Sequence, residues 1–173
     1  MKNILIKNIL LIEEDILPLA EVKLFLRVVS EGDDELIKSN ILAATEFAEQ
    51  YLGRYVHKRK ITCVYKPSPL GEVILPASDI IAIEEVKLKD DDEIILEDGK
   101  DFILSHKKIT FSPHFRNKDI EIRFIAGFAR LPEAIKQGIF FHTSMLYDKE
   151  IMDHEKRESL CLLYKPYRNL RIF

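Results

Sequence analysis

The stretch from Asp33 to Gly53 restricts the fold of this chain more than any other, because its helical period is unbroken. At about 100° per residue, its apolar side chains fall on one half of a helix. They are Leu36, Ile37, Ile41, Ala43, Ala44, Phe47, Ala48, Tyr51 and Leu52. Asp33 or Asp34 can accept hydrogen bonds from the free amides of the first turn, and Gly53 supplies a left-handed residue to end the helix. The sequence therefore predicts one long amphipathic helix with both ends encoded.

Two residues interrupt the pattern of this helix. Asn40 lies within the apolar half, and Leu42 lies within the polar half. We expect Asn40 to be a buried amide paired with a neighbouring group, because an unpaired buried amide costs about 1 to 3 kcal/mol. Leu42 is expected on the outer face of the helix, where a single exposed leucine is ordinary in a monomer. In an assembly, Leu42 would be a candidate contact with the next subunit.

The composition describes one folded domain. The chain has 173 residues, of which 47% are hydrophobic, and a formal net charge of −3 gives no overall reason to expect nucleic-acid binding. Cys63 and Cys161 lie far apart without CxxC spacing, so we expect free thiols and no zinc site, with a distant disulfide left open. The apolar run near the N-terminus is too short for a signal peptide or a membrane span, and residues 1–12 predict a strand or an arm.

The period of the sequence changes on both sides of the long helix. Helical spacing over Pro18–Val28 precedes it, and alternation with β-branched residues follows Gly53. The expected strands are Val56–Tyr65, Glu72–Leu75, Ile80–Leu88, Glu93–Leu96, Phe102–Ser105, Lys108–Phe111 and Ile120–Ala126. Helical spacing returns over Pro132–Glu150 and His154–Tyr164.

This order predicts an α+β fold. The two N-terminal and two C-terminal helices bury their apolar faces most simply against one another, as one bundle. The strands form an antiparallel β-rich insertion between the second and third helices. We expect a single domain over 1–173, and its expected parts are a helical core at 18–53 plus 132–164, a β insertion at 55–126 and a C-terminal tail at 165–173.

Motifs for catalysis are absent from the sequence. Neither a G-x-S-x-G elbow nor a phosphate-binding glycine pattern occurs, and none of the five histidines has a second ligand at metal-binding spacing. His142 lies on an apolar helix face, which favours a hydrogen-bonded core histidine, and Asp90–Glu93 predicts a solvated hairpin tip. We expect no enzyme, metal or cofactor; a site assembled from His142, Asp148 and Glu150 is the remaining alternative.

Charge is distributed unevenly along the chain. Residues 79–101 contain ten acidic and three basic side chains, residues 54–66 contain five basic and no acidic side chains, and residues 159–173 contain three basic side chains and no acid. Opposed patches of this kind favour head-to-tail self-association, in which an acidic edge meets a neighbour's basic edge. Ordinary surface variation is the alternative.

Apolar and aromatic residues also lie outside the expected core. Phe140 and Tyr147 point away from the main apolar face of their helix, so this helix is expected to contact two surfaces. The segment Tyr164–Phe173 is rich in tyrosine, arginine, leucine and phenylalanine, which are typical interface residues. The segment either packs back on its own domain or inserts into a partner.

Four strings lie in order along nearly the whole chain. They are LPLAEVKLFLR at Leu17–Arg27; Asp34–Ile37 with Ala43, Ala44 and Tyr51–Arg54; LPEAIKQ at Leu131–Gln137; and LLYKPYR at Leu162–Arg168. Together they resemble the head-tail connector (adaptor or head-completion) proteins of tailed bacteriophages, including prophage and gene-transfer-agent versions. Pro18 departs from the family, which often has a helix-capping threonine there.

The resemblance implies a structural virion protein without catalysis. Copies would close into a ring beneath the portal, twelve-fold in the virion, and extend the DNA channel towards the tail. The implied partners are the portal protein, other copies of the chain and a tail-side completion or stopper protein. The protein would be made in the bacterial cytoplasm and act at the head-tail junction. The portal contacts carried over are Tyr164, Lys165, Pro166, Tyr167, Arg168, Leu170, Arg171, Ile172 and Phe173.

Further contacts follow if the chain forms such a ring. The expected subunit contacts are Leu42, Phe140 and Tyr147. Non-specific contact with passing DNA is expected if basic residues face the channel; the candidates are Lys58, Arg59, Lys60, Lys107 and Lys108. The alternative function is a non-catalytic protein-binding module of a prophage or bacterial host, with the strands as its recognition surface.

Overall fold

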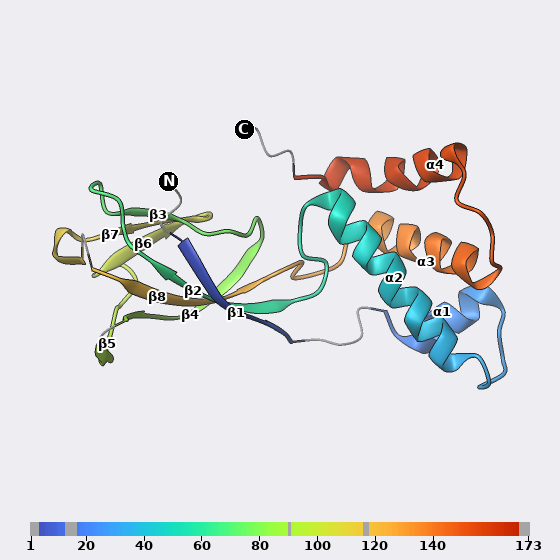
Figure 1. The fold of residues 1–173 in the computed structure, drawn as a ribbon, viewed down its shortest axis with the longest axis horizontal. Coiled ribbons are helices and arrows are strands. Elements are labelled where there is room, and N and C mark those ends of the chain that lie inside the picture. Colours follow the sequence, from blue (N-terminus) through green and yellow to red (C-terminus); the bar gives the residue numbers. More distant parts are fainter. Residues whose placement is uncertain (1–3, 13–16, 90, 116–117, 170–173) are drawn as a thin grey trace. The chain divides into compact units, whose positions relative to one another are not determined.

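The computed structural model describes residues 4–12, 17–89, 91–115 and 118–169 (Figure 1). The chain divides into two compact units. The β unit contains the described residues within 1–13 and 57–129, and the helical unit contains those within 14–56 and 130–173. The predicted α+β fold, with four α-helices and antiparallel sheets, is confirmed.

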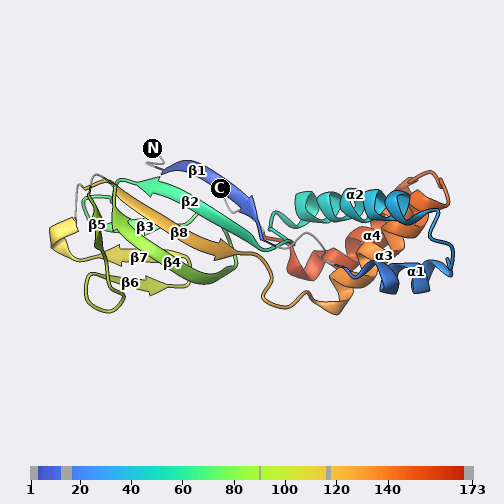
Figure 2. The ribbon, with the colours of Figure 1, turned by 90° about the horizontal axis from the view of Figure 1, so that it is seen from below.

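The β unit consists of two antiparallel sheets (Figure 2). The first sheet has the strand order β1-β2-β8-β4-β5, and the second has the order β3-β7-β6. The first contains β1 Ile4–Leu11, β2 Arg59–Tyr65, β8 Ile120–Ala126, β4 Ile80–Leu88 and β5 Asp91–Ile95. The second contains β3 Glu72–Ile74, β7 Lys108–Phe111 and β6 Phe102–Ser105, followed by a short 3-10 helix at Pro113–Phe115.

The core of the β unit lies between these two sheets. Strand β8 alternates strictly, since successive side chains of a strand point to opposite faces, and its buried residues are Ile120, Ile122, Phe124 and Ala126. Tyr65 lies opposite Ile120 in the β2–β8 register. The Tyr65 hydroxyl donates to the Ile74 carbonyl oxygen of the second sheet at 3.4 Å. This face of the first sheet is therefore covered by the second, and the other face carries the charged residues.

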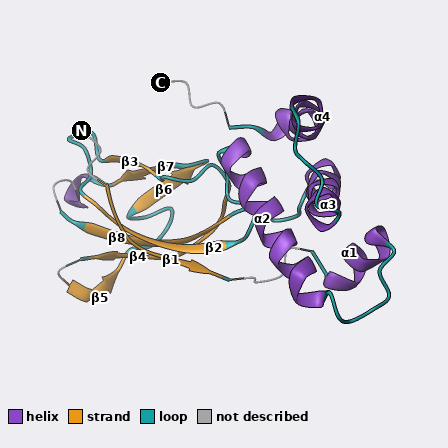
Figure 3. Cartoon of the chain, turned by 45° about the vertical axis from the view of Figure 1, so that its right-hand side comes forward, coloured by secondary structure: helices purple, strands orange, loops and turns teal. Residues whose placement is uncertain are grey.

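The helical unit contains four α-helices (Figure 3). They are α1 Leu19–Leu26, α2 Asp34–Leu52, α3 Glu133–Tyr147 and α4 His154–Tyr164, which continues into a 3-10 turn at Lys165–Tyr167. Helix α3 contacts each of the other three helices. Its buried residues are Ile135, Gly138, Ile139, Phe140, His142, Thr143 and Met145. No helix among the described residues is long and apolar enough to cross a membrane.

The two ends of α2 differ in how well the sequence predicts them. Gly53 is left-handed (φ 62°), and its N–H donates to the Glu49 carbonyl oxygen at 2.9 Å, as expected. The prediction of an aspartate side-chain cap is wrong, because both carboxylates bind other groups. Asp33 Oδ2 accepts from the Tyr147 hydroxyl at 2.8 Å, and Asp34 Oδ1 lies 2.5 Å from Lys23 Nζ.

Several element bounds differ from those expected. Helix α1 ends at Leu26, because Arg27 is left-handed (φ 59°), and α3 ends at Tyr147 before Lys149, which is also left-handed (φ 54°). Strand β2 begins at Arg59, three residues later than predicted. The N-terminal segment is strand β1, paired antiparallel with β2. The expected pairing of Asn40 is wrong among the described residues, where its buried Nδ2 has no hydrogen-bond partner.

Candidate functional site

Tyr164, the first residue of the expected portal-binding segment, belongs to the core of the helical unit. Its side chain is fully buried, and its ring lies 6.1 Å from that of Tyr51, centroid to centroid. The ring also packs directly on Gly138, where a Cβ would collide with it. Burial raises the pKa of Tyr164 above its usual value, so the hydroxyl stays neutral. The prediction that Tyr164 is an exposed contact residue is therefore corrected.

The residues after Tyr164 fold back onto the end of α2. The backbone N–H of Asn169 donates to the Leu52 carbonyl oxygen at 2.8 Å. The Arg168 guanidinium lies 5.0 Å from the centroid of the Tyr51 ring, a cation–π distance. Lys165, Pro166 and Arg168 remain exposed and Tyr167 is half-buried. The other expected portal contacts lie outside the described residues; they are Leu170, Arg171, Ile172 and Phe173.

Leu42 lies on the exposed side of α2, as the sequence predicted. Its side chain is 52% exposed, whereas Ala44 and Thr45 beside it are fully buried. An apolar side chain of this size is available for contact with another protein, but one exposed leucine does not identify a partner. The expected role of Leu42 as a subunit contact stays a prediction.

Phe140 and Tyr147 have partners within the chain. The Phe140 ring lies 5.2 Å from the Phe25 ring of α1, centroid to centroid, and only 6% of Phe140 is exposed. The Tyr147 hydroxyl donates to Asp33, at the start of α2. The second surface that α3 contacts is therefore formed by its own unit. The prediction of Phe140 as a subunit contact is corrected, and the place of Tyr147 requires no neighbouring subunit.

The expected channel residues differ in their exposure and in their ion pairs. Lys60 pairs with Glu84 at 2.9 Å, and Lys108 pairs with Glu72 at 2.6 Å. Lys58 and Arg59 are half-buried at the start of β2, and Lys107 is exposed in the β6–β7 turn. Paired lysines present less net charge to a passing phosphate. Contact of these five residues with DNA stays a prediction.

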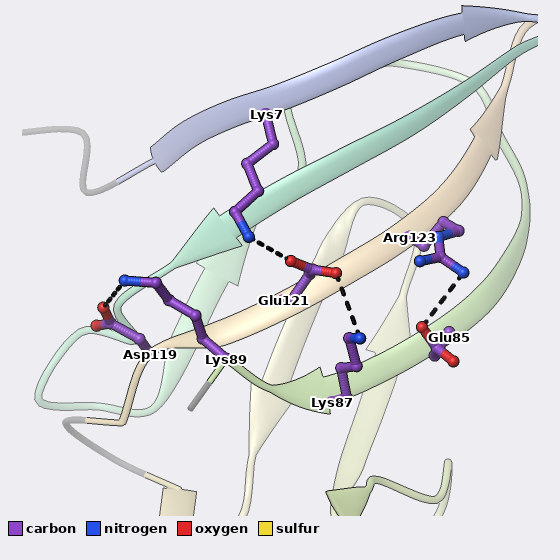
Figure 4. Close-up of polar contacts among 7 residues, drawn as sticks. All are labelled: Lys7, Glu85, Lys87, Lys89, Asp119, Glu121 and Arg123. Atoms are coloured by element: carbon purple, nitrogen blue, oxygen red, sulfur yellow. Dashed lines mark hydrogen bonds and ion pairs between the residues drawn. The ribbon is translucent and has the colours of Figure 1, made fainter. Parts of the chain in front are cut away.

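A ladder of ion pairs crosses the outer face of the first sheet (Figure 4). Glu121 Oε2 of β8 lies 2.6 Å from Lys7 Nζ of β1, and Glu121 Oε1 lies 3.7 Å from Lys87 Nζ of β4. Two further ion pairs lie beside these: Arg123 Nη1 is 3.3 Å from Glu85 Oε2, and Lys89 Nζ is 3.4 Å from Asp119 Oδ2. The register of β8 between its neighbours brings these groups together. Part of the charge that is segregated along the sequence is therefore paired within the β unit.

His142 and the two carboxylates of the alternative enzyme site are not a catalytic group. The His142 ring packs edge-on against Phe47 at 4.9 Å, centroid to centroid, and burial lowers its pKa, which favours the neutral ring. The expected hydrogen bond is missing at Nδ1, which has no partner among the described residues. Asp148 is exposed, and Glu150 pairs with Lys156 at 2.8 Å. No group of three metal-binding side chains occurs in the described part of the chain.

A match to a family profile identifies the protein family of this chain. The profile described as "Phage gp6-like head-tail connector protein" matches residues 17–114, more than half of the chain. The chain belongs to this family. The connector is thus a structural protein, as the four resembling strings predicted. The match includes α1, α2 and most strands of the β unit.

Solved structures share the connector's fold along its length. "Neck of native GTA particle computed with C12 symmetry" matches with a TM-score of 0.72 and 18% identity, covering 98% of this chain and 97% of that chain. "Neck of empty GTA particle computed with C6 symmetry" matches with a TM-score of 0.71 and 17% identity, covering 96% of this chain and 97% of that chain. "Virion of native gene transfer agent (GTA) particle" matches with a TM-score of 0.70 and 18% identity, covering 95% of this chain and 97% of that chain. The comparison with curated proteins found no match.

Proposed function

We propose that this connector forms a closed ring at the neck of a phage or gene-transfer-agent particle, between the portal and the tail. In this role it is made in the bacterial cytoplasm, assembles beneath the portal and extends the DNA channel. The observation that carries the proposal is the family match over residues 17–114. The full-length likeness to chains of necks with C6 and C12 symmetry supports it.

A ring of identical copies requires two different surfaces on each copy. In a head-to-tail ring, one surface of each subunit contacts the other surface of the next, and the contacts close when the rotation divides a full turn. The exposed Leu42 on α2 is one candidate for such a contact. Twelve copies, matching a twelve-fold portal, is the number we propose for the assembled ring.

The portal contact is proposed for the residues beyond Tyr164. Tyr164 acts indirectly, since its burial holds the end of α4 in place. Arg168 and Asn169 then hold the chain against the end of α2. Lys165, Pro166, Tyr167 and Arg168 are the described contact candidates. A tail-side completion or stopper protein would bind the opposite end of the ring, and the connector would catalyse no reaction.

Portal decoration tests this proposal. The full chain is mixed with its cognate portal and imaged by negative stain, and we expect a ring on one end of the portal. Deleting residues 170–173 should abolish decoration without unfolding the chain, because Tyr164, Arg168 and Asn169 are retained. Deleting the whole of Tyr164–Phe173 is a poorer test, since it removes a core side chain.

Leu42→Glu tests the ring contact separately. We expect it to weaken ring formation, while Leu24→Glu, a matched change at an exposed leucine of α1, should not. A chain that folds but never decorates the portal would contradict the proposal. If it instead binds a host protein, and does so without residues 170–173, the binding-module alternative is correct.

A further inference from the structure

Strand β1 presents a row of apolar side chains that its own unit leaves uncovered. Five of its eight residues are apolar and at least 38% exposed. Leu5 (64%) and Leu10 (52%) lie opposite Val64 and Lys60 in the β2 register, and therefore on the outer face of the sheet. Ile6 (44%), Ile9 (38%) and Leu11 (48%) lie on the inner face. Strand β1 therefore exposes apolar side chains on both faces of the sheet edge.

The backbone of β1 is also open along one side. Among the described residues β1 pairs only with β2, so it is an edge strand of the first sheet. Ile12 N–H donates to the Lys58 carbonyl oxygen at 3.0 Å. In the same register Leu10 lies opposite Lys60 and Asn8 opposite Thr62, so the backbone groups of these alternate residues also face β2. Because hydrogen bonding alternates along an antiparallel strand, the N–H and C=O of Ile9 face the open edge. They are available to another strand.

Protection of this edge is slight. Natural edge strands are usually short, or carry lysine, proline or a bulge that blocks pairing with another chain. β1 has no proline, and its lysine, Lys7, is held by Glu121 on the sheet face. A register shift between Ile6 and Asn8 is the one irregularity of its pairing with β2. The segment from Asn8 to Leu11 is regular.

The opposite edge of the same sheet is also open among the described residues. It is strand β5, which pairs only with β4 among the described residues. Ile95, at the end of β5, is 61% exposed and supplies an apolar contact. Every copy of the chain therefore carries two open strand edges in its first sheet, one at β1 and one at β5.

We infer that β1 of one copy pairs edge to edge with β5 of the next copy, so that the first sheets of neighbouring subunits become continuous. Pairing of β1 with β1 would be two-fold symmetric and would end in a dimer, which cannot extend into a ring. Pairing of β1 with β5 is head-to-tail, so it propagates and can close into a ring. The inference rests on the proposed ring and names its subunit contact.

Cross-linking between two single-cysteine chains tests this contact directly. In a Cys161→Ser background, Ile9→Cys and Ile95→Cys chains of different mass are mixed and treated with a bismaleimide. Cys63 can be retained because we expect it not to react with the maleimide: it is fully buried, and burial raises its pKa to about 11. The reaction is run on the concentrated chain alone and on rings assembled with the cognate portal.

The cross-linked species distinguish the outcomes. We expect dimers that join Ile9→Cys to Ile95→Cys, and a ladder of higher oligomers from the doubly substituted chain. Dimers that join Ile9→Cys to itself would show a two-fold β1 contact and overturn the inference. Rings without the mixed dimer would overturn it while the proposed function stands. If no ring and no cross-link form in either sample, both fail.

A backbone variant tests the same contact by assembly. Ile9→Pro removes the outward N–H and retains the N–H groups that face β2. We expect at least about a tenfold loss in self-association, since hydrogen bonds and edge fit are both lost. Ile9→Val keeps the N–H and should assemble normally. If Ile9→Pro fails to fold, Leu5→Glu provides a second test at a more exposed side chain. Normal assembly of a folded Ile9→Pro or Leu5→Glu chain would overturn the inference.

Discussion

The core of the helical unit and the outer face of the first sheet differ in how their polar groups are paired. Within the helical unit, the side chains of Asn40, His142, Thr143 and Tyr164 each have a buried polar atom without a hydrogen-bond partner among the described residues. On the outer face of the first sheet, Glu121 binds two lysines and Arg123 binds Glu85. An unpaired buried group costs about 1 to 3 kcal/mol, whereas surface pairs contribute a little. The helical core therefore has more room for stabilising substitutions.

Tyr164→Ala should produce the largest effect, because it removes a fully buried aromatic ring between α3 and α4. We expect a loss of about 3 to 5 kcal/mol in the free energy of unfolding, measured by urea denaturation followed by circular dichroism. Leu162→Ala, at an exposed leucine of the same helix, should change it by less than about 0.5 kcal/mol. Tyr164→Phe should be neutral or stabilising; equal losses in the alanine variants would contradict the placement of Tyr164.

Gly127→Ala tests whether the β unit is equally sensitive at its backbone. Gly127 has φ 137°, and an added Cβ would lie 2.7 Å from the His57 carbonyl oxygen. We expect backbone strain and steric conflict together to lower the free energy of unfolding by about 2 to 4 kcal/mol. Gly99→Ala is the matched control, with φ 78° but no atom within 4 Å of the added Cβ, and should cost about 1 to 2 kcal/mol. Thermal unfolding of both variants measures the difference, and equal losses would show that the space around Gly127 adjusts.

Local sequence patterns predicted most of the elements in both units. Helix α2 follows from its period and Gly53, and strand β8 follows from its alternation. The bounds of β4, β6, β7, β8 and α4 agree with those expected. These features depend on neighbouring residues in the chain. They can therefore be predicted without knowing what packs against them.

Contacts between distant residues were not predictable in the same way. The pairing of β1 with β2 and the contact of Phe140 with Phe25 depend on tertiary structure. Helical spacing showed that α3 has two apolar faces, but it could not show that both are covered within the chain. The same limit applies to Glu121, whose two lysines come from strands far apart in sequence. The β1 edge was missed because its exposure depends on which strand lies beside it.

Thr143→Val and Thr45→Val sharpen the comparison within the helical unit. Both threonines are fully buried, but among the described residues only Thr45 has a hydrogen-bond partner, since its Oγ1 donates to the Ile41 carbonyl oxygen at 2.7 Å. We expect Thr143→Val to raise the free energy of unfolding by about 1 kcal/mol, and Thr45→Val to lower it by about 0.5 to 1.5 kcal/mol. Urea denaturation measures the free energy of unfolding of each variant and shows whether the two changes have opposite signs. Destabilisation by Thr143→Val would show that its hydroxyl does have a partner.

Glu121→Gln should have the smallest effect and tests the charged face of the β unit. It keeps the shape of the side chain but removes the charge between Lys7 and Lys87, whose side chains are 41% and 16% exposed. We expect a loss of at most about 1 kcal/mol, because partly exposed pairs are screened by solvent, and a smaller loss at high salt. Glu97→Gln, in a pair with Lys100 that is mostly exposed, should cause no measurable change. A loss from Glu121→Gln that is unaffected by salt would show that the ladder acts through hydrogen-bond geometry rather than charge.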